Sequence, residues 1–234
     1  MFSFVAWKWS SGNPDREFHS EHVNVLASML RRHCSLPHRL ICVTDDARGL
    51  DSSIQAMPQP VTFDGVGSPQ GGRFPSCYRR LWNFSHRAAD AFGDRFMALD
   101  IDVVITRNID SLIHRPESFV GWTDAAFKWN KVAGGIYLLR AGAHPEVWDR
   151  FDPRASPQLA YRAGCNGSDQ GWMSYMLFPP PGSWGRADGL YSLKWLRPGA
   201  PLPAEVRVVS TPGALKPWSR EAQRSHPWIK EHWQ

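Results

Sequence analysis

The sequence predicts an α/β fold in which a central sheet is flanked by helices. Strand and helix patterns alternate over residues 1–105, in the order strand, helix, strand, helix, strand. Alternation of this kind favours right-handed crossovers between parallel strands. The last strand of the series is apolar throughout, which is typical of the centre of a covered sheet. At 234 residues, the chain fits one substantial domain with its own core.

The first elements have clear local signals. A strand is predicted for residues 2–7, FSFVAW, and a second for residues 38–46, HRLICVTDD. Between them, residues 20–33, SEHVNVLASMLRRH, predict a helix with one apolar face. Ser20 is the expected N-cap, and charges of the appropriate sign lie at both helix ends. A short strand is expected at residues 61–63, within an excursion rich in Gly and Pro.

The middle of the chain predicts one helix followed by the central strand. Residues 76–93, SCYRRLWNFSHRAADAFG, repeat apolar or small residues at helical spacing and end at Gly93. Residues 96–105, FMALDIDVVI, are too apolar for a half-exposed strand. Because such sheets bind ligands beyond the carboxyl ends of their strands, polar residues in this stretch lie where a ligand is expected.

The second half is less regular. Its expected elements are a strand at 134–142, a short helix at 145–151, a helix at 168–177 with Ser168 as N-cap, and a strand at 205–210. The tail, residues 212–234, is expected to pack over the sheet.

Composition limits the classes of partner. A formal charge of +5 favours an anionic ligand such as a nucleotide, although a mildly basic protein without one fits equally well. The sequence contains no dense run of Lys and Arg of the kind that marks nucleic-acid binding, so nucleic acid is not an expected partner. The four cysteines form no C-x-x-C pair, so buried, reduced thiols are expected. Without a leader or a long apolar segment in this sequence, a cytoplasmic protein that can touch a membrane surface is expected.

Asp100 and Asp102 form a D-x-D motif within the predicted central strand. In an extended segment the two side chains point the same way, and paired carboxylates suit Mg²⁺ or Mn²⁺ bound to a diphosphate. Such a short motif also arises by chance. The alternative is a pair of carboxylates that cap a loop or pair with Arg107.

Five ordered stretches carry a family resemblance. FMALDIDVVITRNIDSLI resembles the metal-binding segment of the GT-A glycosyltransferases, especially the retaining group with glycogenin and the bacterial lipopolysaccharide galactosyl- and glucosyltransferases. The other four stretches are RRLWNF, GGIYLLRAG, GSDQGWMSYML and GALKPW. The resemblance implies a single GT-A domain over residues 1–234, with a mixed, mostly parallel sheet. It further implies metal-dependent transfer of a hexose from a nucleotide sugar, with UDP the expected nucleotide, to a glycan or lipid-linked acceptor of polysaccharide biosynthesis.

The resemblance also implies roles for individual residues. Asp100 and Asp102 match the ligands of Mn²⁺ or Mg²⁺. Asp169 and Gln170 match an aspartate–glutamine pair beside the donor sugar, where they could bind hydroxyls or stabilise an oxocarbenium-like transition state. The residues expected to bind the nucleotide sugar are Trp7, Lys8, Arg80, Asp124, Gly135, Gly213 and Lys216. Structural alternatives are core packing for Trp7, a helix-dipole charge for Asp169 and a surface loop for Asp124.

Two positions depart from the group's pattern. Ser210 stands where the group has a histidine as third metal ligand, and a hydroxyl is a poorer ligand, so the departure bears on the metal. Ala133 stands where the group often has an asparagine, which affects how the donor sugar is held.

Two other classes compete with the transferase. A haloacid dehalogenase-type phosphohydrolase also has D-x-D after an apolar strand, but usually near the start of its chain and with a later pair of acids that binds metal. Here 99 residues precede Asp100, and the candidate later pair, Asp149 and Asp152, lies in an expected helix followed by proline. A carbohydrate-binding protein, including one derived from a transferase, would use some of the 12 Trp as flat faces for sugar rings.

Overall fold

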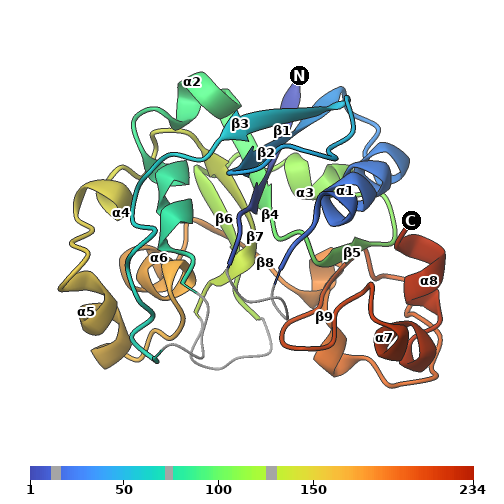
Figure 1. Cartoon of the computed structure of the whole chain (residues 1–234). Helices are drawn as coiled ribbons and strands as arrows, with labels where there is room; N and C mark the ends of the chain where they lie inside the picture. Colours follow the sequence, from blue (N-terminus) through green and yellow to red (C-terminus); the bar gives the residue numbers. More distant parts are fainter. Residues whose placement is uncertain (12–16, 72–75, 125–130) are drawn as a thin grey trace. The chain divides into compact units, whose positions relative to one another are not determined.

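The computed structural model describes residues 1–11, 17–71, 76–124 and 131–234. It contains a seven-stranded sheet in the order β3-β2-β1-β4-β7-β6-β8 and a three-stranded sheet in the order β5-β10-β9 (Figure 1). Most pairings described within the larger sheet are parallel, with β6 and β7 antiparallel. The predicted α/β class is confirmed. The strands are β1 Phe2–Lys8, β2 His38–Thr44, β3 Ile54–Pro58, β4 Arg95–Leu99, β5 Val103–Ile105, β6 Phe119–Trp122, β7 Ala133–Arg140, β8 Gly182–Trp184, β9 Leu190–Ser192 and β10 Val208–Ser210.

Short helices connect most of these strands. The α-helices are α1 Ser20–His33, α2 Ala88–Phe92, α3 Asp110–Ile113, α4 Glu146–Asp149, α5 Ser156–Arg162, α6 Asp169–Leu177, α7 Arg220–Ser225 and α8 Trp228–His232. Three 3₁₀ helices are η2 Tyr78–Phe84, η3 Arg186–Asp188 and η4 Leu193–Trp195. No helix in the described ranges is long and apolar enough to cross a membrane.

The chain divides into two compact units built from interleaved segments. Unit 1 comprises Met1–Gln59, Ala98–Arg115 and Gly185–Gln234; unit 2 comprises Pro60–Met97 and Pro116–Trp184. The expectation of a single domain stays a prediction.

Unit 1 holds the parallel strands β1, β2 and β3 and the three-stranded sheet. Phe2 of β1 lies opposite His38 of β2, and the register continues to the ends of both strands. α1 and α8 both contact β5 of the small sheet. The tail therefore forms part of this unit, with Trp228 and Trp233 buried.

Unit 2 is built around the antiparallel pair β6 and β7, with β8 parallel to β6. α6 packs against β7, α4 and α5. Its Trp172 indole N–H donates a 2.8 Å hydrogen bond to the carbonyl of Val147, which ties α6 to α4. In the same unit, the buried Asn83 amide donates a 2.6 Å hydrogen bond to the Tyr137 hydroxyl.

The predicted central strand at 96–105 is wrong as a single element. It forms β4 and β5, which belong to different sheets, and Asp100–Asp102 lies between them. The Val103 N–H donates a 3.4 Å hydrogen bond to the Asp100 carbonyl, so the chain turns here. Apolar content did not reveal the break, because the residues on both sides of it are buried.

Three other boundaries differ from the predictions. The helix at 76–93 is two helices, η2 and α2, because Ser85 between them has extended backbone angles (φ −70°, ψ 159°). Gly93 is nevertheless the predicted C-terminal glycine, with φ 84°. The strand at 61–63 is wrong, and the third parallel strand is β3, paired with β2. The N-cap of α1 is His19, one residue before the predicted Ser20.

Replacing Tyr137 with Phe should destabilise the fold. The buried Asn83 amide loses the Tyr137 hydroxyl as an acceptor, and the loss of one intramolecular hydrogen bond costs about 0.5–1.5 kcal/mol. The measurement is the free energy of unfolding in urea. Tyr161→Phe on the exposed surface of α5 is the matched control and should change this quantity by less than about 0.5 kcal/mol. Equal stabilities of the two variants would contradict the role of this bond.

Candidate active site

The turn at Asp100–Asp102 in unit 1 carries the first cluster of predicted site residues. The Asp102 side chain is only 10% exposed, and its Oδ2 accepts a hydrogen bond from the ammonium of Lys216, whose side chain is 23% exposed. The two residues are far apart in the sequence. The structure therefore brings together a predicted metal ligand and a predicted phosphate-binding residue. It also makes Lys216, rather than Arg107, the ion-pair partner of Asp102.

The segment after β10 positions Lys216. β10 pairs antiparallel with β5, which places Ser210 opposite Val103, next to the turn. The hydroxyl of Thr211 donates a 2.7 Å hydrogen bond to the Asp102 carbonyl, and the Lys216 ammonium lies 3.4 Å from the Thr211 carbonyl. Gly213 has φ 98°, a conformation that side-chain-bearing residues rarely adopt, so glycine suits this turn.

The electrostatics at Asp102 reflect its burial. Burial raises the pKa of its carboxyl above the usual range, because it penalises the charged form. The Lys216 ammonium acts in the opposite direction, whereas the neighbouring Asp100 carboxylate raises this pKa further. Asp102 is therefore a buried carboxylate that needs a cation beside it.

The donor atoms at this turn fit a hard divalent cation. Asp100 and Asp102 supply carboxylate oxygens, which Mg²⁺ and Mn²⁺ prefer. Within the described ranges there is no group of three or more His, Cys, Asp or Glu side chains that could hold a metal. A metal at this turn would therefore need further ligands from water, from a bound phosphate or from a weak donor such as the Ser210 hydroxyl.

A cavity of about 500 Å³ lies in unit 1 at the ends of β1 and β2. Lys8, the last residue of β1, lines this cavity and is buried. Its position at a strand end is where a cation that contacts a ligand is expected. Trp7 is 5% exposed, which favours the packing alternative, and its expected contact with the nucleotide stays a prediction. The other residues that line the cavity are Ser10, Glu17, Phe18, His19, Ser20, Asp45, Asp46 and Arg48.

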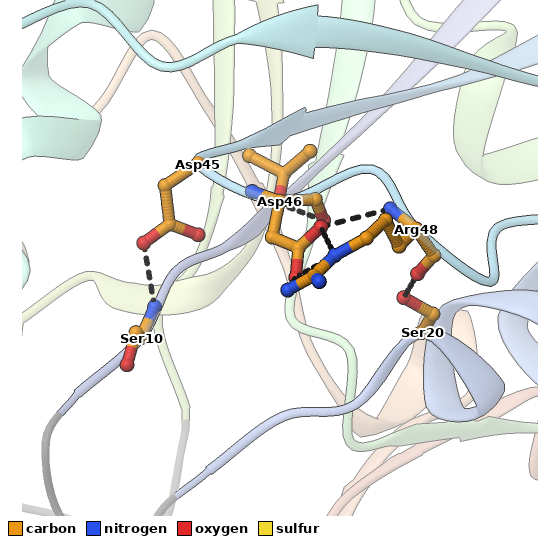
Figure 2. Close-up of polar contacts among 6 residues, drawn as sticks. Ser10, Ser20, Asp45, Asp46 and Arg48 are labelled. Carbon is orange, nitrogen blue, oxygen red and sulfur yellow. Dashed lines mark hydrogen bonds and ion pairs between the residues drawn. The ribbon is translucent and has the colours of Figure 1, made fainter.

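Polar contacts join several of the residues that line this cavity (Figure 2). The Ser10 N–H donates a 2.9 Å hydrogen bond to Asp45, and Arg48 forms a 2.7 Å ion pair with Asp46. The Ser20 hydroxyl donates to the Arg48 carbonyl and so joins the start of α1 to the loop after β2. The guanidinium of Arg48 lowers the pKa of the Asp46 carboxyl well below its usual range.

A second cluster lies in unit 2, at the start of α6. The Arg80 Nε donates a 2.7 Å hydrogen bond to Asp169 Oδ2, and the two side chains are 16% and 3% exposed. Arg80 thus neutralises a carboxylate that is almost fully buried. The adjacent hydroxyl of Tyr78 has a pKa raised by burial and by the charge of Asp169.

Gln170 and β7 complete this cluster. The Gln170 Oε1 accepts a 3.2 Å hydrogen bond from the Gly134 N–H. A methyl group at Gly134 would lie 2.9 Å from the Gln170 Cβ and 3.4 Å from an Arg80 nitrogen, so only glycine fits without displacement. Gly135 follows in β7, half-buried. The structure therefore brings Arg80, Asp169 and Gln170 together against β7.

Asp124 is exposed at the end of β6. Its Oδ1 accepts a 2.7 Å hydrogen bond from the Trp122 indole, and its expected contact with the donor sugar stays a prediction.

Sequence reasoning missed several residues of both clusters. Thr211 holds the metal-site turn, and Ser168 accepts a 2.9 Å hydrogen bond from the Cys77 N–H at the start of η2. The signal for Thr211 is its position directly after Ser210, where the sequence departs from the group's pattern. The signal for Asp45 and Asp46 is their position after β2, because ligands of such sheets bind beyond the carboxyl ends of the strands.

Solved structures of glycosyltransferases match this chain over most of its length. A complex of the galactosyltransferase LgtC with donor and acceptor sugar analogs gives a TM-score of 0.63 at 14% identity, covering 98% of this chain and 94% of that one. An active-site mutant of LgtC gives 0.65, with the same identity and coverage. The glycosyltransferase GlyE of Streptococcus pneumoniae TIGR4 gives 0.59 at 12% identity, covering 94% of this chain and 57% of that one.

This chain has the GT-A glycosyltransferase fold. The architecture predicted from the five ordered stretches is thereby confirmed. No protein-family model and no curated protein matches the sequence. Similarity at this level of identity establishes the GT-A fold alone, and any activity has to be inferred from the side chains.

Removing the guanidinium of Arg80 should destabilise the protein strongly. In Arg80→Met, the Asp169 carboxylate loses the partner of a nearly buried ion pair, and breaking such a pair costs about 3–5 kcal/mol. Urea unfolding measures this loss. Arg87→Met, which removes an exposed arginine before α2, is the control and should change stability by less than about 0.5 kcal/mol. An Arg80→Met protein as stable as the control would disprove the stabilising role of the pair.

Proposed function

We propose that this protein is a glycosyltransferase that moves a hexose from a nucleotide sugar, with UDP as the nucleotide, to a glycan or lipid-linked acceptor. The observation that carries the proposal is the contact between Lys216 and Asp102 in a GT-A fold. Donor transfer needs a cation-rich site at the leaving diphosphate, and this contact joins a phosphate-binding cation to the carboxylates that suit a metal. A cytoplasmic location and retention of anomeric configuration belong to the same proposal, and retention rests on the resemblance alone.

The nucleotide would bind in unit 1. The cavity at the ends of β1 and β2 supplies space for the base and ribose, with Lys8 among its walls. Asp100 and Asp102 would hold Mn²⁺ or Mg²⁺, which when bound would stabilise charge on the leaving diphosphate. Lys216 would contact the same phosphates, and the Gly213 backbone would approach them because no side chain stands in the way.

The donor sugar would contact the cluster at α6. Asp169 is held in one orientation by Arg80, so its carboxylate is preorganised toward developing positive charge. Gln170 is fixed on β7 through Gly134, and its amide is suited to a sugar hydroxyl. One solved LgtC structure is an active-site variant in which glutamine is replaced by glutamate, and the resemblance is the ground for proposing Gln170 as the corresponding residue of this chain. Asp124 and Gly135 are further proposed contacts of the sugar.

The phosphohydrolase alternative receives no support from the later acids. Asp149 pairs with His86 at the surface, and Asp152 caps the following turn by accepting from the N–H groups of Arg154 and Ala155. The non-catalytic alternative differs from the transferase in having no turnover.

Membrane contact would need a surface other than Trp228 and Trp233, because both are buried.

UDP binding should require the metal-site carboxylate. In calorimetric titrations with Mn²⁺ present, the native protein should bind UDP. The Asp102→Asn variant should bind UDP at least about tenfold more weakly, because it has lost one charged metal ligand. Asp90→Asn, at an exposed site on α2, is the control and should bind as the native protein does. A UDP affinity that changes neither with Mn²⁺ nor with Asp102→Asn would refute the proposed metal site.

Asp169→Asn should reduce turnover much more than donor affinity. The substitution should lower kcat about 10²- to 10³-fold, the size typical of removing one preorganised electrostatic group. The measurement is release of UDP from the UDP-sugar found by donor screening, with UDP affinity measured in parallel. Full turnover in this variant would exclude a catalytic role for Asp169, and the absence of turnover in the native protein with every donor would favour the binding-protein alternative.

A further inference from the structure

We infer that Lys216 and the divalent metal bind Asp102 in alternation, so that metal binding releases the Lys216 ammonium for the donor phosphates. The inference rests on the proposed function. Its starting observation is that the ammonium donates directly to Asp102 Oδ2, one of the two oxygens that a metal would use.

A cation beside the Asp102 carboxylate offsets its burial. The Asp102 side chain is only 10% exposed and pairs directly with the Lys216 ammonium, and removing one partner of such a pair without replacing it is costly. Lys216 supplies one positive charge and thereby keeps the turn formed. A dication that binds Asp100 and Asp102 takes over this function and repels the ammonium at short range. Metal and lysine therefore compete for the same carboxylate.

The Lys216 ammonium lies near the cavity proposed for the nucleotide. Lys216 Nζ lies 6.0 Å from the centre of the Phe18 ring, and Phe18 lines the cavity proposed for the nucleotide. Lys216 also has four side-chain torsions and an exposed fraction of 23%, so its head can move without refolding the loop. The ammonium thus needs only to leave Asp102 to face a diphosphate bound at this cavity.

Ser210 makes the exchange between Lys216 and the metal depend on the nucleotide-sugar donor. In place of the family's histidine, it offers only a hydroxyl beside the turn, so the protein alone binds the metal with two charged ligands. Competition from Lys216 weakens that binding further. A diphosphate supplies metal ligands and accepts the ammonium, so metal and nucleotide should raise each other's affinity.

The first test is titration of Mn²⁺ alone, without nucleotide, followed by the electron paramagnetic resonance signal of free Mn²⁺. Lys216→Met should bind Mn²⁺ about tenfold or more tightly than the native protein, because close charge pairs couple at least this strongly. The same variant should bind UDP more weakly in the presence of Mn²⁺. Lys230→Met, an exposed lysine on α8, is matched for net charge and should change neither affinity.

A second test uses the unaltered chain and so does not depend on the stability of a variant. Amine labelling of Lys216, quantified by mass spectrometry, should become at least about threefold faster when Mg²⁺ is added, because the ammonium leaves a buried ion pair. Labelling of Lys230 serves as the internal standard.

The outcomes separate this inference from the proposed function. Equal or weaker Mn²⁺ binding by Lys216→Met, with metal-dependent UDP binding intact in the native protein, would overturn the exchange and leave the transferase proposal standing. Absence of Mn²⁺ binding in both proteins, together with UDP binding that ignores Mn²⁺, would overturn the exchange and the proposed metal dependence together. Tighter Mn²⁺ binding with weaker UDP binding supports the exchange.

Discussion

The buried charge of Asp102 constrains much of unit 1. Its carboxylate lies at the point where the chain leaves β4 for β5, and a carboxylate in that position requires a positive partner. The partner comes from the C-terminal part of the chain, because Lys216 follows β10 and β10 pairs with β5. The small three-stranded sheet therefore joins two segments of the candidate site. Its β5–β10 pairing fixes the Asp100–Asp102 turn and the segment that carries Lys216 to the same backbone ladder.

The same logic organises the second cluster. Asp169 is more deeply buried than Asp102, and Arg80 satisfies it from η2. The difference between the two pairs lies in the cation. A guanidinium has a fixed fork that suits a permanent, oriented contact, whereas an ammonium on a flexible stem suits a contact that is broken and re-formed. Arg80 therefore suits a static contact, and Lys216 suits the exchange inferred above.

The sequence predicted the fold better than it predicted the connections within the site. The helix at Ser20–His33 and the strand pair β1 and β2 follow from local periodicity, and the structure confirms both. The strand at 96–105 failed because two buried strands of different sheets have the same apolar composition as one long strand. Helical spacing over 76–93 likewise could not reveal the extended backbone at Ser85.

The ion pairs could not be predicted for a different reason. Arg80 and Asp169, and likewise Asp102 and Lys216, are brought together only by the tertiary fold, and a single sequence contains no signal for such pairing. The resemblance identified all four of these residues. It assigned each to a ligand, whereas the structure shows that each also satisfies another residue of the site.

Charge balance explains why one residue can serve both the fold and the chemistry. The two carboxylates at the turn carry two negative charges, and Lys216 alone offsets one of them. A dication offsets both, which leaves the ammonium as surplus positive charge at the place where a diphosphate would add negative charge. Under the proposed exchange, each binding step would create the charge that the next ligand needs, and the buried acid that constrains the fold would also order metal and donor binding.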